Sequence, residues 1–411
     1  MTALADSYKL EIEFLFSGTF GNAFVLDSST LDSATDRLTG LAWIDVTSDV
    51  VEITVNRGRS RQLDSFDSGT MNFTLRNNTR KYDPTNTASP YYGSIEPRRR
   101  VRLSANSTYL YTGWVDDWNI DYSQPNESRI SATCVDAFSI LASIQLDEFT
   151  FTNGQRTDQR ITTVLGLPEV SGAGITTSLE TGDSTLADDT VALGTTVLDY
   201  LQRVNRSEQG YLFVNSSGVL RFRRRTTSYS GTVPTFQDTA PTTSSEYKYM
   251  GVSVQFGTEL LYNRITVVND GGTPQTVNDA TSESAYLTRT LELGDLILET
   301  DAQALNVANF LLGKYALPEF RFDSVTISLE NIATAGQNTL FAIEPNDLVQ
   351  VKRTYTTGTP LIVTRYGVVE GIEHNISISA HTITFSLSPA QGTFRLDSSV
   401  FGVLDSNTLG I

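Results

Sequence analysis

The sequence predicts a mainly β protein with an α+β insert, in which two strand-rich blocks flank a smaller α/β block. In residues 1–135 and again in 247–389, apolar residues alternate at a period of two, as half-buried strands require. Between these blocks, residues 136–246 show helical spacing and capping residues. A chain of 411 residues is too long for one compact core, so we expect two to four domains.

Strands in the first block follow from side-chain alternation. Apolar residues of one parity occur at 10–16, 51–55, 71–75 and 114–122, with turn-forming residues between them. Cys134 shares the apolar face of a further strand, and we expect it to be a small core residue. As the only cysteine, it excludes an intrachain disulfide and a cysteine-based zinc site.

The middle block changes to helical spacing. We expect three helices, because a capping residue precedes apolar residues spaced three or four apart in three places. Asp136 is expected to cap the first helix, Thr157 or Asp158 opens the second, and Thr195 or Thr196 starts the third. A hairpin is expected at 211–214 and 219–222, around a Ser-Ser-Gly turn.

The last block returns to alternation. The expected strands lie at 252–256, 265–267, 325–329, 349–351, 361–363 and 383–387. One helix, at about 300–316, interrupts them. Its start at Thr300 fits a capping box with Gln303, and Pro318 follows its expected end.

A short motif occurs near both ends of the chain. Residues 24–29 and 394–399 both place a leucine before Asp-Ser-Ser, and 404–406 repeats Leu-Asp-Ser. Such a motif favours a turn after a buried anchor. Two interpretations stay open for residues 390–411: surface turns, or an extended C-terminal arm that docks on a neighbour, as apolar tails usually pack against something.

The charge balance excludes a protein that grips nucleic acid. The chain carries 30 basic and 47 acidic residues, a net charge of −17. Binding to DNA normally needs a basic surface that releases counterions. DNA could therefore pass this protein without being held. We find no secretion signal and no apolar stretch of roughly 20 residues, and we expect synthesis in a cytoplasm and no membrane span.

Residues for catalysis or metal binding are scarce. The sequence has no nucleophile elbow, no P-loop and no complete dinucleotide-binding loop. The only histidines, His374 and His381, can face one another across a turn, but no nearby acid or cysteine completes a metal set. We therefore expect no enzyme activity, no cofactor and no metal.

Two further patterns have structural interpretations that we prefer to catalytic ones. Asp116-Asp117 and Asp188-Asp189 are paired carboxylates, but adjacent strand residues point to opposite faces, so solvated charge is expected. Trp114 and Trp118 share a face and could stack on a sugar, although core packing is the preferred interpretation.

Arginine clusters stand out against the acidic background, at 98–102 and 221–225. They could contact phosphate, but arginine is enriched at protein interfaces and the overall field repels DNA. We therefore predict a subunit or partner interface. Its candidate residues are Arg57, Arg59, Arg98, Arg99, Arg100, Arg223, Arg224, Phe394, Leu396, Phe401 and Leu404.

An ordered series of motifs resembles the tail-hub (minor tail) proteins of long-tailed bacteriophages. The motifs lie at 45–50, 57–61, 66–69, 75–77, 83–86, 89–93, 97–99, 111–114, 262–267, 347–349, 371–374 and 396–405. The helix at 300–316, followed by Pro318 and Arg321-Phe322, has its place in the same order. The resemblance spans nearly the whole chain and depends on the order of the motifs rather than on any one of them.

The resemblance implies a fold of tail-hub type, with two β-barrel-like domains at 1–135 and 247–389. It also implies a homotrimeric ring with pseudo-sixfold symmetry around a DNA channel, located in the virion at the tail tip. The implied partners are the distal tail or tail tube protein, the tape-measure protein, and fibre or spike proteins, with DNA only in transit. No lysozyme-like or peptidase-like region is apparent.

Two other classes stay open. The first is a receptor- or glycan-binding tail adhesin that uses Trp114, Trp118 and Tyr91-Tyr92 as stacking residues. The second is a cell-wall hydrolase that uses the paired carboxylates.

Overall fold

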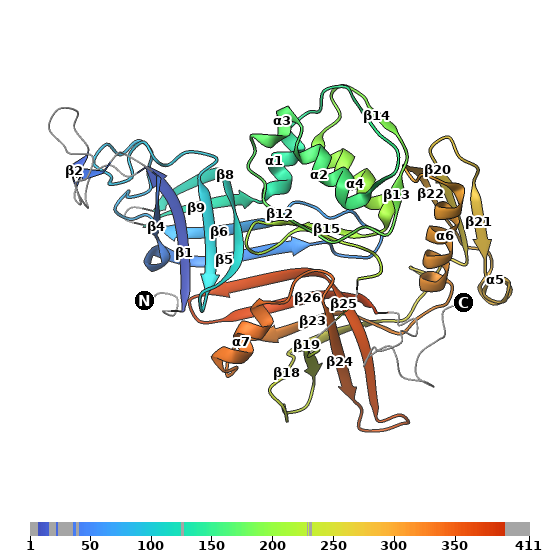
Figure 1. The fold of residues 1–411 in the computed structure, drawn as a ribbon. Coiled ribbons are helices and arrows are strands. Elements are labelled where there is room, and N and C mark those ends of the chain that lie inside the picture. The colour runs from blue at the N-terminus through green and yellow to red at the C-terminus, as the bar shows by residue number, and fades with distance from the viewer. Residues whose placement is uncertain are drawn as a thin grey trace.

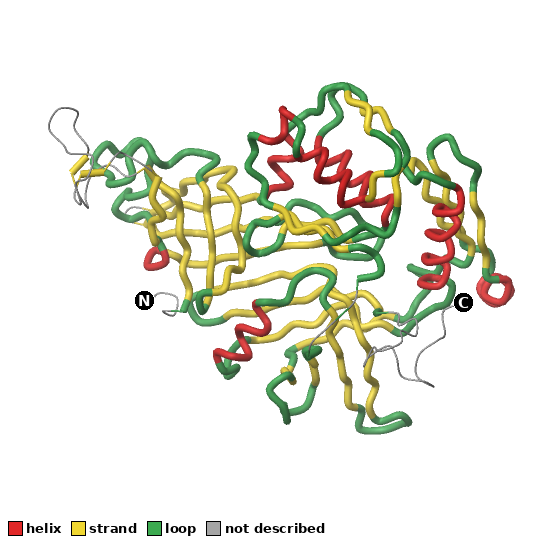
Figure 2. Tube along the Cα trace, in the orientation of Figure 1, coloured by secondary structure: helices red, strands yellow, loops and turns green. Residues whose placement is uncertain are grey.

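The structure is a computed structural model that describes residues 7–15, 22–23, 36–37, 41–124, 127–227, 229 and 232–390. Phe394, Leu396, Phe401 and Leu404 lie outside these residues, as does the expected arm after Ala390. Two strand units dominate the fold and join in one large sheet, and helices lie both above and below its strands in the view of Figures 1 and 2. This confirms the predicted fold class.

The first strand unit comes from the beginning of the chain. Its strands are β1 (Tyr8–Leu15), β4 (Leu41–Asp45), β5 (Val50–Gly58), β6 (Thr70–Arg76), β7 (Arg100–Ala105), β8 (Thr108–Gln124) and β9 (Glu127–Val135). A 3₁₀ turn, η1 (Thr47–Asp49), connects β4 to β5, and two short strands, β2 (Asn22–Ala23) and β3 (Asp36–Arg37), pair separately. Alternate residues of β5 and β6 are buried, as their sequence pattern predicts.

The second strand unit comes from the end of the chain. Its strands are β17 (Thr235–Gln237), β18 (Glu246–Lys248), β19 (Gly251–Gln255), β23 (Arg321–Ser328), β24 (Leu348–Thr354), β25 (Ile362–Ser377) and β26 (His381–Pro389). Helix α7 (Thr334–Phe341) lies between β23 and β24 in the chain.

The two units have the same strand order. The first runs β5-β6-β9-β8-β7-β1-β4 and the second runs β19-β23-β26-β25-β24-β17-β18. When the strands of each unit are numbered in chain order, both paths give the same series of numbers. The units differ in the direction of one strand. Strand β1 is antiparallel to β4 and β7, whereas its counterpart β17 is parallel to β18 and β24. The expected pair of similar strand-rich units is confirmed in this strand order.

Between the units lies the α/β region. It contains α1 (Ala137–Ser143), β10 (Phe149–Phe151), β11 (Gln155–Arg156), α2 (Thr157–Leu165), α3 (Pro168–Ser171), β12 (Thr177–Leu179), β13 (Thr185–Leu186), β14 (Asp189–Val191), α4 (Val197–Glu208), β15 (Tyr211–Val214) and β16 (Leu220–Arg223). Asp136 and Thr196 accept hydrogen bonds from backbone N–H groups at the starts of α1 and α4, as predicted. The expected hairpin is β15–β16.

A further segment is inserted between β19 and β23. It contains β20 (Arg264–Asn269), β21 (Gln275–Asn278), α5 (Ala280–Tyr286), β22 (Thr290–Leu296) and α6 (Asp301–Tyr315). The predicted helix near 300–316 is α6. Thr300 caps it by accepting a hydrogen bond from Gln303 N, but the Gln303 side chain donates to Thr185 instead of closing a capping box.

Two hydrophobic cores hold these parts. The first contains buried side chains of both strand units, such as Phe73 and Phe385. The second combines the α/β region with the inserted segment, since Ile265 and Leu311 pack with Leu201 and its neighbours. Residues 264–315 therefore pack with the preceding α/β region, whereas the boundaries at 135/136, 246/247 and 389/390 stay predictions.

Single side chains follow the predicted packing to different degrees. Cys134 is fully buried in the first core, as predicted. Trp118 is half-buried and meets Phe73 edge to face, and its Nε1 donates to the Glu96 carbonyl oxygen at 3.0 Å. Trp114 is half-buried and packs against the second core. Both indoles thus pack at core margins.

Candidate functional site

The two strand units join where β5 pairs antiparallel with β25, from Glu52 opposite Ser377 to Gly58 opposite Gly371. Gly58 has a positive φ of 93°, and a Cβ placed there would lie 2.3 Å from the Glu370 carbonyl oxygen. Only glycine allows this close approach of the two backbones. The union of the units therefore depends on backbone contact at the end of this strand pair.

A buried ionic cluster lies beside this crossing. We call Arg59, Tyr211, Glu370 and Ser388 the junction cluster. Arg59 Nε lies 2.7 Å from Glu370 Oε2, and the Tyr211 hydroxyl donates to Glu370 Oε1 at 2.9 Å. Ser388 Oγ also donates to Oε1. The cluster thus connects the first unit, the α/β region and the second unit.

The electrostatics of the junction cluster keep Glu370 charged. Burial alone would raise the pKa of Glu370, but the positive charges of Arg59 and Lys314 and the Ser388 hydrogen bond outweigh it and lower that pKa. Burial raises the pKa of Tyr211, so its hydroxyl stays a donor. The Arg59 guanidinium also stacks over the Phe66 ring at 4.6 Å. Glu370 is fully buried, so its charge depends on these neighbouring groups.

A second junction cluster consists of Arg57, Ser216, Arg223, Glu344 and Asp347. Arg57 Nη1 lies 2.6 Å from Glu344 Oε2, and Ser216 N donates to Glu344 Oε1 at 3.1 Å. Asp347 accepts from Glu344 N at 2.8 Å and from Arg223 Nη1 at 2.8 Å. The first unit, the α/β hairpin and the second unit meet here again, so charge pairs fix their relative position.

The histidines lie between the units. His374 Nδ1 and His381 Nε2 are 3.0 Å apart, and the Tyr8 hydroxyl lies 2.6 Å from His381 Nδ1. The prediction that the two histidines face one another is confirmed. Burial lowers the pKa of His381 to about 3 and that of His374 well below its usual value, so both rings are neutral.

The lowered pKa of His381 predicts that the stability of the fold is sensitive to acid. Between pH 6.5 and about 3 the unfolded chain binds a proton at His381 that the folded chain does not, so stability falls as the pH decreases through this window. From pH 7 to 5 the loss is about 2 kcal/mol for His381. Urea unfolding at both pH values should show a smaller loss for His381→Gln than for the wild type. An equal loss in both proteins would contradict this assignment.

The predicted interface arginines are dispersed over the structure. Arg57, Arg59 and Arg223 belong to the two junction clusters, and Arg224 pairs with Asp183. Their charges are thus engaged within the chain.

The remaining predicted arginines lie together after a long loop of the first unit. Arg99 pairs with Glu96, while Arg98 and Arg100 are exposed, and the Arg100 guanidinium lies 5.6 Å from the Trp43 ring centroid. These two are the described members of the predicted interface that face solvent.

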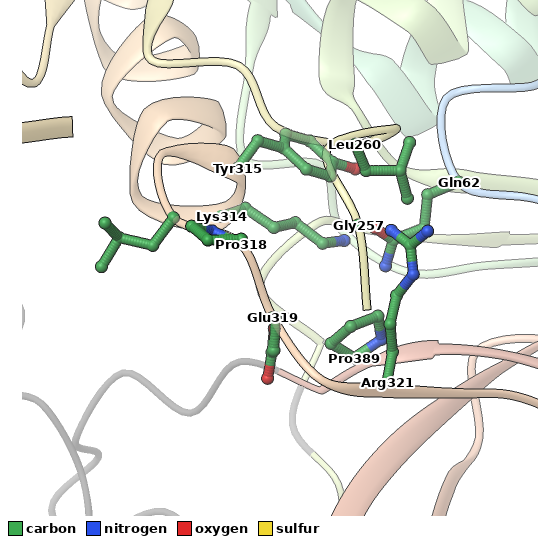
Figure 3. A pocket seen from close by; sticks show the side chains of 10 residues that line it. Gln62, Gly257, Leu260, Lys314, Tyr315, Pro318, Glu319, Arg321 and Pro389 are labelled. Atoms are coloured by element: carbon green, nitrogen blue, oxygen red, sulfur yellow. The ribbon is translucent and has the colours of Figure 1, made fainter. Parts of the chain in front are cut away.

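Other acids are also bound within the described part of the chain: buried Glu208 accepts from Thr157 Oγ1 at 2.9 Å and lies 3.6 Å from Arg225 Nη1. No group of three or more potential metal ligands occurs among its residues. Asp189 of the second carboxylate pair is bound to Arg203 at 2.8 Å. A small pocket beside the end of α6 is lined by Lys314, Tyr315, Glu319 and Arg321 (Figure 3). It brings no pair of carboxylates together.

Sequence reasoning missed the acidic partners of the junction clusters. Glu370 stands within the apolar run Val368-Val369-Glu370-Gly371-Ile372, where an isolated acid marks a buried charge. That signal could have found Glu370. Glu344 has no comparable signal, because it lies in a short polar turn before β24.

Comparison with known proteins identifies solved structures of similar fold. No protein-family model matches the sequence, and no curated protein matches it. Among solved structures, the 43 kDa tail protein of prophage MuSo2 from Shewanella oneidensis is similar, with 14% identity, a TM-score of 0.58, and coverage of 94% of this chain and 97% of that one. A tail protein from Neisseria meningitidis has 11% identity, a TM-score of 0.59, and coverage of 93% and 95%.

These likenesses extend over nearly the whole of each chain. The protein therefore has the fold of phage tail proteins, which confirms the predicted resemblance at the level of the fold. No helix in the described ranges combines the length and the apolar character needed to cross a bilayer.

Proposed function

We propose that this protein is a structural hub subunit of a phage tail tip, which forms a homotrimeric ring with pseudo-sixfold symmetry. The observation that carries the proposal is the repeated strand order of the two units. Three chains with two equivalent units each supply six similar positions around an axis. Closed rotational symmetry of this kind also covers strand edges that a lone chain exposes.

The proposed ring joins the tail tube or distal tail ring to fibre or spike proteins and encloses the channel for DNA and the tape-measure protein. The net charge of −17 supports passage of DNA without binding. The subunit is made in the host bacterial cytoplasm and is located in the virion. Arg98 and Arg100, together with the predicted residues after position 390, are its proposed contacts with neighbours.

The proposed role is non-enzymatic. It is supported by the likeness in fold to tail proteins and by the internal pairing of the buried acidic residues, which leaves Glu344 and Glu370 bound to arginines. Buried acids paired in this way are not available to a substrate, and removal of one partner would leave an uncompensated buried charge.

Mass measurement of the assembled protein tests the stoichiometry. We expect a complex with three times the chain mass of 45.1 kDa, observed by native mass spectrometry or by light scattering at increasing protein concentration. Particle images should show a ring with a central opening. A stable dimer, or a monomer that persists within purified tail tips, would contradict the proposal.

A further inference from the structure

We propose that β19 of one chain adds to β8 of a second copy as an antiparallel strand, with Gly251 opposite Ser123 and Val254 opposite Ile120. The inference rests on the proposed assembly and specifies its interface strand by strand. It derives from the repeated topology of the chain, in which one such strand pair is already formed internally.

The internal pair is the template. Within the chain, β5 pairs with the C-terminal half of β25, so that Ile53 lies opposite Ile376 and Val55 opposite His374. In the repeated strand order, β19 has the place of β5 and β8 has the place of β25. The equivalent pair would therefore be β19 with the C-terminal half of β8.

A shared β-bulge aligns β8 with β25. In the first unit β8 shifts register against β9 between Val115 and Asp117. In the second unit β25 shifts against β26 between Val369 and Gly371. Because a bulge is a local insertion in one strand, its position fixes the correspondence, and Asp117–Ser123 of β8 matches Gly371–Ser377 of β25.

The neighbouring strands align β19 with β5. The bulge alignment matches Trp118 with Ile372, so their partners Ala132 of β9 and Phe385 of β26 also correspond. Phe73 of β6 lies opposite Ala132 and Val325 of β23 lies opposite Phe385, which makes Val325 the counterpart of Phe73. Phe73 also lies opposite Ile53 of β5, and Val325 lies opposite Val252 of β19. Val252 therefore corresponds to Ile53. Since Ile53 pairs with Ile376, whose counterpart in β8 is Tyr122, the register places Val252 opposite Tyr122.

Both edges are unpaired in the described part of the chain. There, β19 pairs with β23 alone, and residues 117–122 of β8 pair with β9 alone. The exposure of these edges differs from that of the internal pair. Val55, which lies opposite His374 of β25, is fully buried, whereas Val254 is 40% exposed and Phe256 is 70% exposed. Tyr122 on β8 is 53% exposed. Apolar strand edges of this kind are pairing sites.

The two edges suit a second copy of the chain rather than each other. The internal junction is formed by β5 and β25, and β8 and β19 lie in different halves of the molecule, above and below this junction in Figure 1. Each chain thus offers one edge of each kind. A head-to-tail contact between unlike edges repeats from chain to chain and closes into a ring when the rotation permits.

Single cysteines test the register between chains. We would mix a Val252→Cys chain with a Tyr122→Cys chain, oxidise the assembled protein, and examine it on a non-reducing gel. The native Cys134 is fully buried and does not compete. We expect a shift of the monomer band to a linked dimer, because directly opposite residues have Cβ atoms about 4.5–5.5 Å apart.

The matched control mixes Val252→Cys with Asp121→Cys. Asp121 neighbours Tyr122 but points to the opposite face of the strand, so no linked dimer is expected. Neither single variant alone should give a linked dimer. Linkage in the control mixture equal to that in the test mixture would overturn the register.

The outcomes separate the inference from the proposed function. If the mixture forms a trimer by mass but gives no linked dimer, the strand pairing is wrong and the hub proposal stands. Coverage of β19 by residues 391–411 of its own chain would give this result. If no trimer forms under any condition, both proposals fail.

Discussion

Replacing Glu370 with alanine is expected to lower the free energy of unfolding by about 3–5 kcal/mol, because Arg59 would keep a buried charge without its partner. The Tyr211 and Ser388 hydroxyls would lose an acceptor in the same step. Chemical denaturation followed by tryptophan fluorescence would measure the loss. It should be among the largest effects of any single substitution in the chain.

Two variants make this experiment specific. Glu373→Ala changes an acidic residue three positions along the same strand that is only half-buried and bonded to Asn375. Its effect should stay within about 0.5 kcal/mol. Glu370→Gln keeps an acceptor for the hydroxyls but loses the charge, and should fall between the two. Equal losses for Glu370→Ala and Glu373→Ala would refute the role of the junction cluster.

Replacing Gly58 with alanine is the second change for which we expect a large effect. The new Cβ would lie 2.3 Å from the Glu370 carbonyl oxygen, a backbone atom at the contact that joins the strand units. The clash adds to the cost of a positive φ, which is about 1–2 kcal/mol for a residue with a side chain. We expect a total loss of roughly 3 kcal/mol or more, measured as a fall in the denaturation midpoint.

Gly93→Ala is the matched control for Gly58→Ala. Gly93 also has a positive φ, of 76°, but a Cβ there would have no atom within 4 Å. It should show only the cost of the backbone conformation. If the two alanine variants lose the same stability, the steric clash with the Glu370 backbone at Gly58 does not contribute to the loss.

Much of the local structure was predictable from the sequence, because it depends on neighbouring residues. Asp136 and Thr196 cap helices through hydrogen bonds to N–H groups two or three positions away. The alternation in β5 and β6 predicts which side chains are buried, since successive strand residues point to opposite faces. The burial of Cys134 follows from the same rule.

The partners of the site residues could not be predicted from the sequence. The sequence predicts Arg57 and Arg59 as interface residues, and the structure pairs each with an acid about 300 positions away in the chain. An arginine beside a glycine turn has the same sequence appearance whether its partner lies in another subunit or in a distant strand. The pairing of His374 with His381 could be predicted, because only a short turn separates them.

The order of strand-rich and helical parts, the helix starts and the net acidic charge follow from the sequence alone, since they depend on composition and short-range spacing. Three other features depend on contacts between distant parts of the folded chain. Residues 264–315 join the second core, β5 pairs with β25, and Glu370 accepts hydrogen bonds from Arg59, Tyr211 and Ser388. A repeating pattern specifies which face of an element is apolar. Which distant element covers that face is decided by the packing of the whole chain.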